Sequence, residues 1–248
     1  NIIIAEENSE LNIISGCASH PGLTTGMHLG ISEFYVKKNA KLSFTMIHNW
    51  ENNIEVRPRS AAIVEEGGTY ISNYIIMNPV KIVQSYPTVH LNGDNSTAIM
   101  SSVIVAINDS IVDTGSRVII KGKGASAEIL SRAISKGGTI YSRGDIVGDS
   151  PDARGHLECM GMMLSEQGSI IAIPELEAKY PNVDLSHEAA IGKIAEEEIF
   201  YLMSRGFTRD EATAAIVRGF LDIEIKGLSP ALKKKIDEAI NLVEKELI

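Results

Sequence analysis

Two cysteines, Cys17 and Cys159, are the residues best suited to soft-metal or sulfur chemistry in this chain. Two are too few for a disulfide framework, and they lack C-x-x-C spacing. Cys17 precedes His20 and His28, but a single Cys-x-x-His pattern without a second matching pair is a weak indication of metal binding. In a β-rich chain a lone cysteine is more often a small buried hydrophobic residue, so neither cysteine identifies a site alone.

The adjacent pair His187 and Glu188 combines an imidazole with a carboxylate. Both groups can bind a metal ion. The pair also lies just ahead of a segment with a helical pattern, where Ser186 or the Glu188 charge can cap the helix or complement its dipole. Both interpretations stay open from these residues alone.

Three other histidines lie in segments that alternate like strands. His48 and His90 are typical of satisfied, half-buried imidazoles rather than catalytic ones. His156 precedes Cys159 by three positions, and this odd spacing places the two side chains on opposite faces of a strand. We therefore keep His156 only as a reserve ligand.

The charge of the chain argues against nucleic-acid binding. Asp and Glu outnumber Lys and Arg by 32 to 23, which gives a net charge of −9 over 248 residues, whereas phosphate recognition needs clustered basic residues. The basic run 233–235 fits the solvated face of a helix. No apolar stretch approaches the roughly 20 residues that span a membrane, and we expect a cytoplasmic protein. The phosphate-binding G-x-x-x-x-G-K-[ST] pattern is missing, so ATP hydrolysis would have to come from a partner.

Residues 1–184 have the pattern of a β domain. In 41–50, Leu42, Phe44, Met46 and His48 alternate with a second, mainly polar face at the strand period of two. Similar runs are separated by glycine-containing turns at 65–68, 92–95, 121–124, 136–139 and 166–169. Their irregular recurrence favours the stacked coils of a solenoid, with a β-sandwich as the alternative.

Residues 185–248 have a helical pattern. Ile191, Ile194 and Ile199 recur near helical spacing, and Gly206 is a typical helix stop. Thr208 and Glu211 form a capping box for a second helix. A third is expected from Ser229, with Pro230 at its first position. Three short helices bury little apolar surface alone, so this region should pack on the β domain or on a partner.

The run 185–220, LSHEAAIGKIAEEEIFYLMSRGFTRDEATAAIVRGF, resembles the C-terminal signature of the SufB/SufD family of iron–sulfur cluster assembly proteins. Upstream segments similar to family landmarks occur in family order: HNW at 48–50, GDNS at 93–96, DTGS at 113–116 and ARGHLEC at 153–159. The resemblance implies a right-handed parallel β-helix with a C-terminal helical region that docks a SufC-like ABC ATPase.

The resemblance also implies a ligand set for a transient iron–sulfur cluster. Cys159 matches the SufB cysteine, Glu188 the SufB glutamate, and His187 a histidine found in both SufB and SufD. The family forms its clusters where two β-helical subunits meet. A homodimer, or a SufB/SufD-type dimer, is therefore expected, with a sulfur donor and apoprotein acceptors as further partners.

Two positions depart from the SufB pattern. Ser186 replaces a glutamate that usually precedes the histidine, and the upstream sulfur-receiving cysteine of bacterial SufB falls near Ala62. The route by which sulfur would enter is therefore undefined.

Three functions are compatible with this sequence. The first is a non-enzymatic scaffold that builds and transfers iron–sulfur clusters with an ATPase. The second is a SufD-like supporting subunit, although such a subunit needs neither Cys159 nor Glu188. The third is a carbohydrate-active enzyme on a β-helix, which the aromatic content of 5% makes the weakest candidate.

Overall fold

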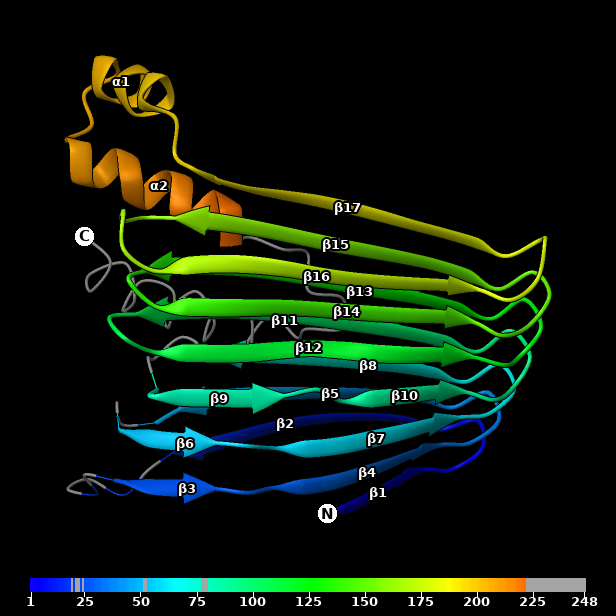
Figure 1. The fold of residues 1–248 in the computed structure, drawn as a ribbon. Helices are drawn as coiled ribbons and strands as arrows, with labels where there is room; N and C mark the ends of the chain where they lie inside the picture. The colour runs from blue at the N-terminus through cyan, green and yellow to red at the C-terminus, as the bar shows by residue number, and fades with distance from the viewer. Residues whose placement is uncertain (19, 21–22, 24, 51–52, 77–79, 222–248) are drawn as a thin grey trace.

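The computed structural model describes residues 1–18, 20, 23, 25–50, 53–76 and 80–221, which form a parallel β-helix followed by two helices (Figure 1). The strands of this described part lie in two sheets. Sheet A contains β1 (Ile2–Ala5), β3 (Gly26–His28), β4 (Ile31–Val36), β6 (Ile54–Val56), β7 (Arg59–Val64), β9 (Ile82–Ser85), β10 (Thr88–Leu91), β12 (Ile111–Ile120), β14 (Thr139–Gly148) and β16 (Ser169–Ala178). Sheet B contains β2 (Glu10–Ala18), β5 (Lys41–Asn49), β8 (Thr69–Ile76), β11 (Thr97–Ile107), β13 (Ser126–Lys136), β15 (Arg154–Met163) and β17 (Asp184–Lys193).

Each coil lies in parallel register on the next. In sheet B, Lys41 pairs with Thr69, and Thr69 pairs with Thr97. Side chains that touch across neighbouring coils are accordingly 25 to 31 residues apart, as in Arg59 with Gln84, Lys37 with Glu65 and Asn39 with Asn8. This repeat confirms the predicted parallel β-helix and excludes the sandwich.

One corner of the solenoid is built from residues with left-handed backbone geometry. The amide of Asn39 donates to the carbonyl of Glu66 on the next coil, and that of Gly67 donates to the carbonyl of Asp94. Asparagine and glycine adopt positive φ at the least cost. The stacked positions are Asn8, Asn39, Gly67, Asn95, Gly124 and Asp152.

The core lies inside the coils, where inward side chains stack by register. Leu42 lies beside Tyr70, and the column continues through Ala98 and Ala127 to Gly155. All four side chains before the glycine are almost fully buried. Since burying a leucine-sized side chain is worth about 1.5–3 kcal/mol, these columns hold successive coils together.

The two described helices are α1 (Glu196–Ser204) and α2 (Arg209–Leu221). Gly206 ends the first with a φ of 99°. The predicted capping box is confirmed, because the Thr208 amide donates to the Glu211 carboxylate at 2.7 Å and the Glu211 amide donates to Thr208 Oγ1 at 3.2 Å. Apolar residues of α2, including Val217 and Leu221, join a cluster with residues of sheet B.

The helical region begins later than predicted from the sequence. Residues 184–193 form strand β17, which pairs in register with β15 along its whole length (Figure 1). Leu185, His187, Ala189 and Ile191 also recur at a spacing of two, and pairing satisfies the backbone groups of β15 that a helix here would leave without partners. The helix expected from Ser229 lies outside the described residues. In the described part, no helix is long and apolar enough to cross a membrane.

His48 is buried in the solenoid and accepts a hydrogen bond at Nδ1 from Trp50 Nε1 at 3.1 Å. The rings of His48 and Tyr74 pack edge to face. Burial lowers the pKa of His48 to about 4, and nearby His28 adds to the decrease. The imidazole is therefore neutral at pH 7, as a satisfied structural histidine should be.

Replacing His48 with glutamine should flatten the pH dependence of stability. The pKa of His48 rises from about 4 in the folded chain to about 6.5 when unfolded, so the unfolded state binds the extra proton and stability falls as pH drops through this window. The native chain should lose about 2 kcal/mol more than His48→Gln between pH 7 and pH 5. Urea unfolding at both pH values measures this difference, and parallel losses would contradict it.

Candidate metal centre

Cys159 lies on the inner face of β15, one strand in from the C-terminal end of sheet B. Its side chain is 3% exposed and belongs to the main core cluster. By register it lies between Ser131 on β13 and Ala189 on β17. The Ser142 hydroxyl, from sheet A, is 3.8 Å from Cys159 Sγ. The predicted ligand thus points into the solenoid beneath its last coil.

Burial raises the pKa of the Cys159 thiol above its ordinary value, and the Ser142 hydroxyl offsets only part of that effect. The closed structure therefore holds a protonated thiol at neutral pH. Because the thiolate is the form that binds metals and accepts sulfur, chemistry at Cys159 requires the last coil to move or a metal to displace the proton.

His187 projects from the same face of its strand as Cys159. It pairs in register with Leu157, a fully buried core residue, while Cys159 pairs with Ala189. The two side chains are therefore diagonal neighbours, with their backbones roughly 8 Å apart from standard strand dimensions. His187 is exposed because β17 is the last described strand of sheet B. Together they place an imidazole and a thiol at the open end of the solenoid.

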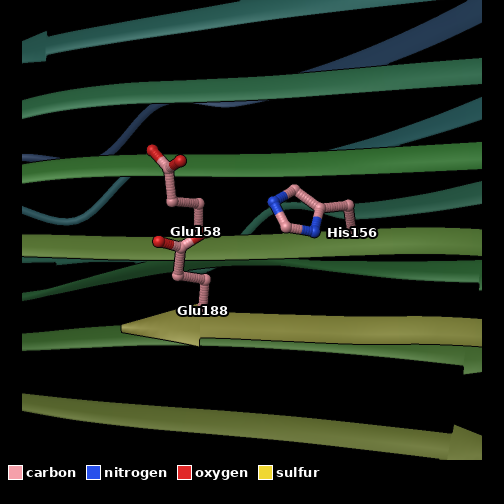
Figure 2. Close-up of side chains that lie close together, drawn as sticks. All are labelled: His156, Glu158 and Glu188. Atoms are coloured by element: carbon pink, nitrogen blue, oxygen red, sulfur yellow. The ribbon is translucent and has the colours of Figure 1, made fainter. Parts of the chain in front are cut away.

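Glu188 projects from the opposite, outer face of β17. It pairs in register with Glu158 rather than with the cysteine. Donor atoms of Glu188, Glu158 and His156 lie within 4.8 Å of one another (Figure 2). The three predicted ligands are thus divided within one chain, with Cys159 and His187 inside and Glu188 outside.

Sequence reasoning placed His156 and Cys159 on opposite faces, and the structure agrees. The sequence alone did not identify Glu158 as a neighbour of Glu188. The available signal was the strand period around ARGHLEC, which places His156 and Glu158 on one face, but their pairing with Glu188 required the register of β17.

Cys17 lies far along the solenoid, on β2 at the N-terminal end of sheet B. Its Sγ is 4.0 Å from Met46 Sδ. The nearby internal cavity is also lined by His28 and His48. Burial raises the pKa of the Cys17 thiol as well. The two cysteines therefore belong to separate environments.

Comparison with known proteins gives one family. Residues 1–220 match the family model described as SUF system FeS cluster assembly, SufBD core domain. The chain is 67% identical over 248 residues to an iron-sulfur cluster assembly SufBD family protein of Archaeoglobus fulgidus, covering all of this chain and 67% of that protein.

Two further archaeal relatives carry the same family description. A protein of Methanothermobacter thermautotrophicus is 53% identical over 243 residues, which are 98% of this chain and 59% of the relative. A Pyrococcus horikoshii protein is 33% identical over 241 residues, which are 97% of this chain and 54% of the relative. The chain thus spans between about half and two thirds of these relatives.

Proposed function

Because the chain belongs to the SufBD core family of the SUF iron–sulfur cluster assembly system, we propose that it is a scaffold on which clusters are built and passed on. The single observation that supports this role best is the placement of Cys159 and His187 on one face at the open end of the solenoid. We further propose that the scaffold is not itself an enzyme and that a SufC-like ABC ATPase drives it.

The donor set suits transient cluster assembly. A thiolate is a soft ligand for iron and can carry sulfur as a persulfide, while an imidazole from His187 is a more labile ligand. A site with few thiolates holds a cluster less firmly than an all-cysteine cage. Iron and sulfide are here the cargo of the protein, and a sulfur donor and recipient apoproteins are its further partners.

A second subunit would complete the site. In the described part of the chain, β16 and β17 each pair with a neighbour on one side only, leaving the far edges of the last coil open. Unpaired strand edges are templates for association. A two-fold homodimer would bring the exposed His187 of one subunit toward Cys159 of the other, and would let Glu188 act across the interface. A SufB/SufD-type dimer would use the same edge.

The helices are the proposed attachment point for the ATPase. Helix α1 buries Ile199 but exposes Phe200 and Tyr201 by 57% and 59%, and Phe207 beyond its end is also exposed. Exposed aromatic side chains of this kind are typical of protein interfaces. Since β17 leads directly into α1 (Figure 1), a force on the helices would reach the strand that covers Cys159.

A SufD-like supporting role is the second candidate. The burial of Cys159 and the position of Glu188 on the other face favour it, because one closed chain does not assemble the ligand set. Iron binding distinguishes the two roles.

Substitution of Cys159 tests the scaffold directly. After anaerobic reconstitution with iron and sulfide, Cys159→Ser should retain less than about a tenth of the native cluster iron, because a hydroxyl is a poor ligand for iron. Cys17→Ser is the matched control and should bind nearly as much as the native chain. Iron analysis and visible spectra measure the loss, and equal iron in both variants would favour the supporting role.

Mixed dimers test whether the site is shared. Cys159→Ser and His187→Ala homodimers should each bind little cluster iron. After subunit exchange, each mixed dimer has one site lacking both residues and one site with both intact, so about half of the cluster iron per mixed dimer should return. Native mass spectrometry verifies the exchange. No return of iron despite exchange would place each site within one chain.

The α1 surface can be tested without disturbing the solenoid. Phe200→Ser with Phe207→Ser should reduce co-purification of a SufC-like ATPase at least about tenfold, because exposed aromatic residues contribute strongly to interfaces. Ile111→Ser is the control, because it alters an exposed apolar side chain on sheet A, away from the helices. Undiminished ATPase binding by the double variant would rule out this docking surface.

A further inference from the structure

Donor groups from two neighbouring strands meet on the outer face of sheet B, away from Cys159. His156 and Glu158 project from β15 and Glu188 from β17 (Figure 2). We propose that these three side chains form a mononuclear site for a divalent first-row transition ion, such as Fe²⁺. The proposal does not rest on the cluster-assembly function, because it follows from the grouping of these donor atoms on the outer face, although Glu188 is also a proposed cluster ligand.

The donor set matches the chemistry of such ions. One imidazole and two carboxylates are the combination that binds Fe²⁺, Mn²⁺, Co²⁺ or Zn²⁺ rather than the all-oxygen set preferred by Mg²⁺ and Ca²⁺. Ligand atoms around one such ion, with bonds of roughly 2.1 Å, lie about 3–4 Å apart. The donor atoms of the three side chains all lie within 4.8 Å of one another. Small rotations of the two glutamate side chains would bring them into the range that an ion requires.

His156 is already oriented for binding. Its Nδ1 is 2.9 Å from the hydroxyl of Ser186 on β17. A hydrogen bond from one ring nitrogen to a neighbouring group fixes the ring and presents the other nitrogen to a metal. Nε2 is therefore the ligand atom. Ser186 stands where the family pattern usually has a glutamate, and it acts here as a positioning residue.

The charges around the site limit its affinity but do not prevent binding. Glu158 is half-buried and forms an ion pair with Arg132 on β13, whose guanidinium also lies 6.0 Å from the centre of the Phe220 ring. Glu188 is exposed and supplies the second negative charge. A divalent ion would therefore compete with Arg132 for Glu158, which favours a reversible site over a permanent one.

An entry path lies beside the site. His156 and Ser186 line an open groove on sheet B, together with the acidic residues Glu128 and Asp184 and the basic residue Arg154. Glu128 pairs in register with His156. Carboxylates along this groove raise the local concentration of cations. The geometry thus provides ligands, an orienting hydrogen bond and access for a hydrated ion.

Cobalt titration of the full chain, stripped of metal with a chelator, tests the site. Visible absorption should reveal one tight Co²⁺ per chain, with bands of a nitrogen and oxygen site. His156→Ala should weaken binding on the order of a hundredfold, and Ser186→Ala about tenfold. Arg132→Gln should tighten binding several-fold because Glu158 loses its competing cation. His90→Ala, which alters a histidine on sheet A, should leave the affinity unchanged.

Cys159→Ser separates this site from the cluster site. It should keep the His156-dependent cobalt spectrum while losing the reconstituted cluster. Affinities that are unchanged in both His156→Ala and Arg132→Gln would overturn the proposal. Cobalt binding that disappears in Cys159→Ser, or that carries a thiolate-to-cobalt charge-transfer band, would overturn it as well by assigning the ion to the inner face. Urea unfolding of each variant confirms that lost affinity is not lost structure.

Discussion

The parallel hydrogen-bond ladder between successive coils is the constraint on which the rest of the structure depends. It satisfies the backbone of every internal strand and stacks like positions above one another, so that the core forms columns such as Leu42, Tyr70 and Ala98. A ladder of this kind has no natural end. In the described part of the chain, it stops at β16 and β17 with open edges. The proposed cluster ligands Cys159 and His187 lie at that end.

Much of the solenoid is visible in local sequence. The alternation in residues 41–50 predicted β5, and glycines such as Gly67 marked the turns because they take positive φ. The same corner is occupied by Asn8 and Asn39 in other coils, which a search for glycine overlooks. Strand β17 was mistaken for helix because its apolar residues fit both periods. Pairing with β15, a partner distant in sequence, decides between the two.

Local sequence could not show whether His187 or Glu188 shares the face of Cys159, because that depends on the register of β17 against β15. Arg154 pairs with Asp184, and this register places Ala189 beside Cys159, so that His187 shares the inner face. A connection from β15 through β16 to β17 that was shorter or longer by one residue would exchange His187 and Glu188 between the two faces. Family resemblance gives the identity of these residues, but only the length of the last coil determines which of them can meet the thiol.

Strand β17 therefore links three features that are separate in the sequence. Its inner face carries His187, its outer face carries Glu188 and Ser186, and its end continues into α1. Its ladder bonds join it to β15 alone, whereas α2 is anchored to sheet B through a cluster that includes Met162. A pull on α1 would thus act on a strand that pairs with one neighbour only. Displacing that strand would expose Cys159 and reduce the desolvation that raises the pKa of its thiol, and it would separate Glu188 from Glu158 in the same movement. A single pull on α1 would in this way change the surroundings of His187 on one face of β17 and of Glu188 on the other.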